Sequence, residues 1–199
     1  MSVLPISGFD DWKRTVKEKR EKDPLQTFAI LLYSDANERL FEFVHKRYLT
    51  LDNLTAEDFT VFVIWYLLIK DTVTAPHSFG GVSKEITAYD LARHFDFEIQ
   101  KVPCLVFFRE ITKSDIIIYR LNDAWEDSEI LEEFEKLTDD VTKARRKAKG
   151  KKKPAEAQWR ALEWALRRRR WIRGAAKATR AAMPILDVVQ AILNLLPKE

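Results

Sequence analysis

Four short apolar runs constrain the fold of this chain most strongly. Residues 27–33 (Thr-Phe-Ala-Ile-Leu-Leu-Tyr) and residues 59–68 are continuous apolar runs, which is typical of central strands buried on both faces. Val102-Pro103 leads into a third run over residues 104–109. Residues 115–121 form the fourth, after a turn. The sequence therefore predicts a four-stranded sheet whose last two strands form a hairpin.

Helical patterns alternate with these runs. Residues 9–21 carry apolar side chains at helical spacing, and residues 87–95 look helical, after a loop at residues 70–83. Two further helices are expected, one after an N-cap at Ser34 and one after an N-cap at Ser128. The order helix, strand, helix, strand, helix, strand, strand, helix predicts an α/β domain with a mixed sheet and helices on both faces.

This order, with the residues in it, resembles the thioredoxin-like superfamily. Residues 91–103 are similar to the segment that leads to the cis-proline of that family, and the residues after them match its final hairpin and last helix. The resemblance covers roughly residues 7–137. It implies a thioredoxin-like fold, with helices on both faces of a mixed four-stranded sheet and with Pro103 as a structural cis-proline.

The chain departs from that family at the redox site. Redox-active members open the helix after the first central strand with Cys-x-x-Cys, whose thiol is activated by the helix N-terminus. Here the junction over residues 34–38 reads Ser-Asp-Ala-Asn-Glu, and the chain has a single cysteine, Cys104. Dithiol exchange needs one thiol to attack and one to resolve. We therefore expect a divergent, redox-inactive member that is not an enzyme.

Two residues keep an enzymatic alternative open. Cys104 could be a lone reactive thiol, or a buried strand cysteine that packs as a small hydrophobe. Ser34 occupies the position of the catalytic hydroxyl of glutathione transferases, or it is an N-cap. His45, His77 and His94 show no ligand spacing, so the sequence predicts no metal site and no cofactor.

Charge divides the chain into an acidic part and a basic part. Residues 1–137 hold 17 Lys/Arg and 25 Asp/Glu, a net charge of −8, whereas residues 138–199 hold 17 and 6, a net charge of +11. We expect a thioredoxin-like domain over residues 1–137, a basic linker over residues 138–154 and a helical arm over residues 155–199. The candidate polyanion-binding residues are Arg145, Arg146, Lys151, Lys152, Lys153, Arg167, Arg168, Arg169 and Arg170.

The arm carries the candidate partner-binding residues. Trp159, Trp164 and Trp171 alternate with arginines in a predicted helix, and residues 184–196 form an almost entirely apolar segment that must lie on something. The apolar contacts expected in that segment are Ile185, Val189, Ile192 and Leu196. At 13 residues it cannot span a bilayer, and no other stretch reaches the ~20 apolar residues that a span requires.

These patterns predict a scaffold or adaptor that engages a macromolecular partner through the arm, with a protein partner or self-association favoured. The first alternative is a nucleic-acid-associated protein that binds polyanions through the basic tail. The second is peripheral attachment to an anionic membrane surface. The single cysteine suits a reducing compartment, and the first residues lack the pattern of a secretory signal, so a cytoplasmic location is expected.

Overall fold

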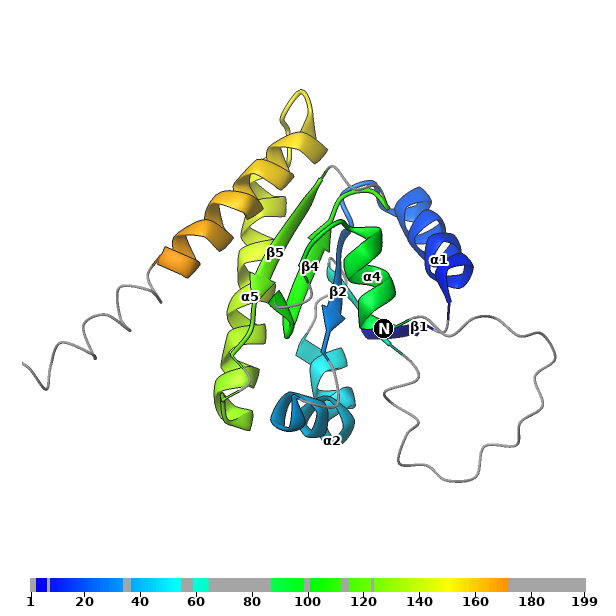
Figure 1. The fold of residues 1–199 in the computed structure, drawn as a ribbon. Coiled ribbons are helices and arrows are strands. Elements are labelled where there is room, and N and C mark those ends of the chain that lie inside the picture. The colour runs from blue at the N-terminus through cyan, green and yellow to red at the C-terminus, as the bar shows by residue number, and fades with distance from the viewer. Residues whose placement is uncertain are drawn as a thin grey trace, which may run out of the picture. The chain divides into compact units, whose positions relative to one another are not determined.

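A computed structural model of the chain describes residues 3–6, 8–33, 37–54, 59–64, 87–98, 101–111, 115–122 and 124–171. Its elements in chain order are β1 (Val3–Ile6), α1 (Phe9–Lys22), β2 (Thr27–Leu32), α2 (Glu38–Leu54), β3 (Phe59–Ile64), α4 (Ala88–His94), β4 (Cys104–Phe108), β5 (Ile116–Arg120) and α5 (Asp127–Ala148) (Figure 1). Residues 154–171 form a further helix. None of the helices in these ranges combines the length and the apolar character that crossing a membrane requires.

Five strands form one mixed sheet, in the order β1-β3-β2-β4-β5. β1 and β2 both pair with β3 in parallel, whereas β2 pairs with β4, and β4 with β5, in antiparallel fashion. The mixed α/β architecture agrees with the sequence analysis. β2, β3 and β4 are buried along their whole length, as their continuous apolar runs predict.

The sheet has one strand more than the four that the sequence predicts. The additional strand, β1, lies at the edge and has only four residues, so it gives no periodic signal. It also contains Pro5, which cannot donate to a ladder and which strands tolerate at an edge. A hydrogen bond to α2 also stabilises β1, because the backbone N–H of Val3 donates to Asp52 Oδ1 at 2.8 Å.

An aromatic cluster fills the core on the face of the sheet that α1 and α4 cover. Phe28, Phe62 and Phe108 come from β2, β3 and β4, and their ring centroids lie 5.8 to 6.3 Å apart in stacked pairs. Trp12 of α1 meets Phe108 edge-on at 5.3 Å, and Phe95, just after α4, lies 5.7 Å from the Trp12 ring. Aromatic side chains bury large areas, so this cluster fixes both helices on the sheet.

The opposite face of the sheet is covered by α2 and α5. Tyr119 of β5 pairs with Leu105 of β4 on this face, and its hydroxyl bonds the Glu133 carboxylate of α5. α5 begins at Asp127 after an N-cap at Glu126, two residues before the expected cap at Ser128. The cap forms a reciprocal box in which Glu129 accepts a hydrogen bond from the backbone N–H of Glu126 at 3.0 Å.

α5 also ends later than the sequence analysis expects. Residues 138–148, placed there in a basic linker, belong to this helix, and the side chains of Val141, Ala144 and Ala148 are buried. The chain then turns at Gly150, whose φ of 77° lies in the left-handed region that glycine adopts without steric cost. The cations in this stretch are typical of a linker, but the small apolar residues between them continue the buried face of the helix.

The chain divides into two compact units, Met1–Leu162 and Glu163–Glu199, which differs from the expected boundary at residue 137. The first unit contains the sheet, the helices that pack on it, the turn at Gly150 and the first residues of the helix that follows. Gln158 anchors that helix, because its Nε2 donates to the Leu25 carbonyl and to Thr27 Oγ1, both at 2.9 Å. The expected loop at residues 70–83 and the final helix lie outside the described residues.

Candidate functional site

Pro103 and Cys104 lie where β4 begins, beside the carboxyl end of β2. The Val102–Pro103 peptide bond is cis, the conformation expected from the sequence. Cys104 pairs with Leu32 of β2 on one side and with Arg120 of β5 on the other. Ser34, the other catalytic alternative, lies outside the described residues.

The environment of Cys104 is that of a packed core side chain. It is completely buried, and burial raises the pKa of its thiol to about 12, against the smaller opposing effects of Arg120 and Lys101. Because the thiolate is the reactive form of cysteine, such a thiol is inert near neutral pH. The geometry therefore favours the small-hydrophobe interpretation of this residue.

The histidines are packed against aromatic rings. His45 stacks on Phe41 with ring centroids 4.2 Å apart, and His94 lies 5.7 Å from the ring of Trp12. Within the described ranges, no three His, Cys, Asp or Glu side chains gather where they could hold a metal ion. His77 lies outside those ranges.

Trp164 and Trp171 lie in the second unit, and both are strongly exposed, at 59% and 74%. With Arg167 and Arg168 they occupy positions i, i+3, i+4 and i+7 of one helix, which lie on one face. We call these four residues the arm surface. The Arg168 guanidinium lies 5.5 Å from the centre of the Trp164 ring, and Arg167 pairs with Glu163 at 2.7 Å. The ring of Trp164 is thus covered in part by a cation, an interaction that leaves the charged group in contact with water.

Trp159 differs from the other two arm tryptophans. It belongs to the first unit, is half-buried, and lines a cavity together with Leu162. The sequence places it on a stripe with leucines, which agrees with this position. Of the other residues in the arm, Arg170 is exposed and Arg169 is half-buried, whereas Ile185, Val189, Ile192 and Leu196 lie outside the described residues.

The cations at the end of α5 and in the turn after it fall into two kinds. Arg146, Lys151, Lys152 and Lys153 are exposed, as a polyanion-binding surface requires. Arg145 is different, since its Nη1 lies 2.5 Å from Asp23 Oδ2 and its side chain is 19% exposed. It therefore ties α5 to the residue that ends α1, and we assign it a structural role.

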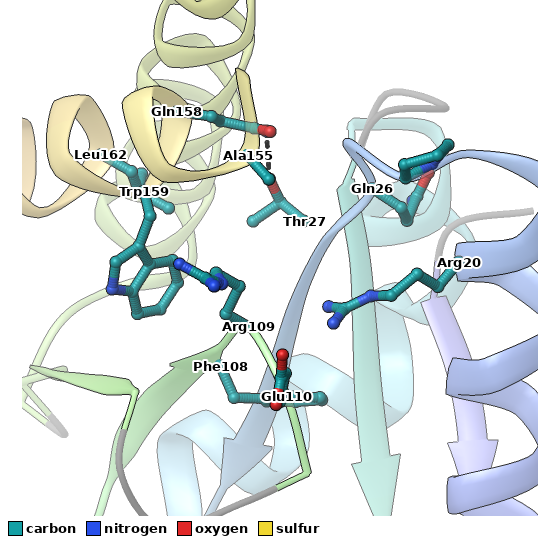
Figure 2. A pocket seen from close by; sticks show the side chains of 11 residues that line it. Arg20, Gln26, Thr27, Phe108, Arg109, Glu110, Ala155, Gln158, Trp159 and Leu162 are labelled. Atoms are coloured by element: carbon teal, nitrogen blue, oxygen red, sulfur yellow. Dashed lines mark hydrogen bonds between the residues drawn. The ribbon is translucent and has the colours of Figure 1, made fainter. Parts of the chain in front are cut away.

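A cavity that the sequence analysis did not predict lies where β2 begins and β4 ends. Its volume is about 170 Å³. Figure 2 shows side chains from α1, the start of β2, the end of β4 and the helix at residues 154–162 around it. The residues that contribute charge are Arg20, Arg109 and Glu110. They lie up to 90 positions apart, and only the folded sheet brings them together, so no local sequence pattern marks them.

Comparison of the chain with models of protein families, with curated proteins and with solved structures gives no match. Function must therefore be inferred from the arrangement of the side chains themselves. Within the part of the chain that the structure describes, the arm surface and the cavity are the arrangements from which we infer function.

Proposed function

We propose that this chain is a redox-inactive, thioredoxin-like scaffold that binds a protein partner through the arm surface. The observation that carries the proposal is the exposure of Trp164 and Trp171 on one face of a helix. Large aromatic side chains are seldom left in water, and tryptophan with arginine is the composition enriched at binding hot spots. Covering each ring is worth on the order of 2–4 kcal/mol.

Three features support the thioredoxin-like part of the proposal. The sheet order β1-β3-β2-β4-β5 combines parallel inner pairing with a final antiparallel hairpin, and helices cover both faces. The cis bond at Pro103 stands directly before β4. These features support the resemblance found in the sequence, although β1 adds a fifth strand to the four that it implies.

The redox-inactive part rests on the cysteine content. Thiol–disulfide exchange within one chain needs an attacking and a resolving thiol, and this chain has only Cys104. That residue is buried in β4 with a raised pKa. The sheet domain then serves as a rigid body that carries the arm.

A second candidate function is binding of nucleic acid. The exposed cations Arg146, Lys151, Lys152 and Lys153 favour it, because they lie close together in the chain, although Lys153 also pairs with Glu156 at 3.3 Å. Phosphate neutralisation of this kind makes binding fall steeply as salt rises. Salt dependence therefore separates the two candidates.

Replacement of both arm tryptophans tests the proposal. Tagged full-length chain and its W164A/W171A variant are used to capture proteins from an extract of the source cells, at low and at high salt. We expect specific proteins to be recovered at both salt concentrations, and to be depleted at least about tenfold with the variant, since hot-spot tryptophans cost 2 kcal/mol or more when truncated.

The matched control is Y89A, which removes the exposed aromatic ring of Tyr89 in α4. It should recover the same proteins as the unchanged chain. Equal recovery with W164A/W171A and the unchanged chain would contradict the proposal. Captured material that disappears after nuclease treatment or at high salt would instead favour the nucleic-acid function.

A further inference from the structure

The cavity of Figure 2 lies at the end of the sheet away from Pro103, because Pro103 precedes β4 and the cavity is lined by Phe108, the last residue of that strand. It belongs to the first unit alone. The arm surface contributes nothing to it, so what it binds is independent of the function proposed above.

Arg20 is the residue that makes this cavity unusual. Its guanidinium lies over the ring of Phe28 at 5.2 Å, and its Nε is buried without a hydrogen-bond acceptor among the described residues. Burial lowers the pKa of Arg20, Arg109 lowers it further, and Glu110 acts in the opposite direction. Because the Nε atom is enclosed by protein, a ligand in the cavity would meet the terminal N–H groups of this guanidinium, which point away from α1 in Figure 2.

Arg109 supplies a second cation to the same cavity. Its Nη1 lies 3.8 Å from Asp115 Oδ2, which is too long for a hydrogen bond, so this ion pair leaves the N–H groups of the guanidinium able to donate elsewhere. A guanidinium presents five donors in a planar fork that matches the oxygens of a phosphate or carboxylate. Two such forks on one small cavity are the composition of an oxyanion site.

Polar side chains in the same cavity offer further donors. Thr27 Oγ1 accepts a hydrogen bond from Gln158 Nε2 at 2.9 Å, which leaves its own O–H able to donate. Gln26 Nε2 uses one N–H on Thr60 Oγ1 at 2.9 Å and keeps a second. The rings of Phe108 and Trp159 complete the walls with apolar surface.

We propose that this cavity binds the oxyanion group of a small ligand, held between Arg20 and Arg109. The volume of about 170 Å³ is roughly half of the ~300 Å³ at which pockets for drug-sized ligands begin. The ligand is therefore a single phosphate or carboxylate group with few atoms attached. Glu110 lies exposed on the same cavity and opposes the anion, so it sets the affinity below what the two arginines alone would give.

The test is a titration of the full-length, ¹⁵N-labelled chain with inorganic phosphate, and separately with acetate, at constant ionic strength. The Nε–Hε signal of Arg20 is assigned by its loss in R20Q. We expect this signal to shift and saturate, and the response to phosphate against acetate then identifies which oxyanion the site prefers. A shift that never saturates with either anion would overturn the proposal.

Three variants are expected to change the affinity for the anion in different directions. The affinity is measured from the shifts of backbone amide signals around the cavity. R20Q and R109Q should each weaken binding at least about tenfold, because each removes a charged hydrogen-bond donor. E110Q should strengthen binding, because it removes the opposing charge. R14Q, on the same helix as Arg20 but paired with Asp11 at the surface, is the control and should bind as the unchanged chain does.

The backbone spectrum of each variant shows whether the variant remains folded. If R20Q does not fold, R109Q still tests the proposal. Weaker binding in E110Q, or an equal loss in R14Q and R20Q, would contradict a site built from these two arginines.

Discussion

At the scale of single residues, burial decides what Cys104 can do. Its side chain is enclosed by the neighbouring strands, and no cation close enough to offset the cost of a buried thiolate is present among the described residues, since Arg120 and Lys101 have only smaller effects. Near neutral pH the folded chain therefore holds the thiol in its protonated form.

We expect Cys104 to resist alkylation in the folded protein at pH 8 and to react readily once the chain is unfolded in denaturant. Iodoacetamide labelling followed by mass spectrometry measures both states, and C104S gives the background. Rapid labelling under native conditions would contradict a buried, protonated thiol. Because folding raises the pKa from 9.0 to about 12, the stabilising contribution of the protonated thiol is complete below pH 9 and is lost as the pH rises toward 12.

The sequence predicts the roles of some single residues and not of others. The sequence indicates that Cys104 can pack as a small hydrophobic side chain, since this residue begins an apolar run. The guanidinium of Arg20 was not recognisable as part of a site, because Arg109 stands 89 positions later and the pairing of β2 with β4 is what brings them to one cavity. Likewise, Arg145 looks like any other cation in its basic run until its contact with Asp23 is seen.

At the scale of elements, α5 shows that many basic residues can make a helix look like a linker in the sequence. Its buried stripe continues through Leu137, Val141, Ala144 and Ala148, at spacings of three and four residues, while the positions between them are basic. The last turn is also rich in Arg and Lys, which interact favourably with the C-terminal end of the helix dipole. Charge alone is therefore a poor indicator of a linker.

Val141 and Lys143 provide a matched pair in this part of α5. V141A should lower the free energy of unfolding by about 1–3 kcal/mol, because it removes two buried methyl groups and leaves a cavity. K143A should change it by no more than about 0.5 kcal/mol, because Lys143 is exposed. Urea denaturation of the full chain measures both, and equal effects would show that residues 138–148 do not pack as α5 does here.

The sequence predicts most elements because their periodicity is strong. The bounds of α1, β2, β4 and β5 fall within a residue or so of the expected ranges, since each has caps or turns at its ends. β1 escapes prediction because four residues with a proline carry no period. The second apolar run includes β3, which is described as far as Ile64. Residues 65–68 of that run lie outside the described part of the chain.

At the scale of the molecule, the structure enlarges the domain that the sequence outlines. The compact first unit reaches Leu162, so it includes the turn at Gly150 and the anchor at Gln158. The positive net charge that the sequence assigns to residues 138–199 is thus shared between both units. Division of the chain by charge and division by packing give different boundaries.

A pair of truncations distinguishes these boundaries. We expect residues 1–162 to unfold cooperatively in urea, whereas residues 1–137 should be less stable by several kcal/mol or fail to fold. The shorter piece lacks the buried side chains of Val141, Ala144 and Leu162 and the hydrogen bonds of Gln158. Equal midpoints for the two pieces would contradict the larger domain.

The hydrogen bond between Gln158 and Thr27 has a consequence for how the protein is made. It joins residues 131 positions apart, and Thr27 opens the central strand of the sheet. During synthesis the strands of the sheet leave the ribosome long before residue 158 does, and contacts of such separation are slow to close. The cavity beside Thr27 is therefore incomplete until residues 155–162 have been made and have packed, and an anion bound there as proposed would stabilise only chains that contain them.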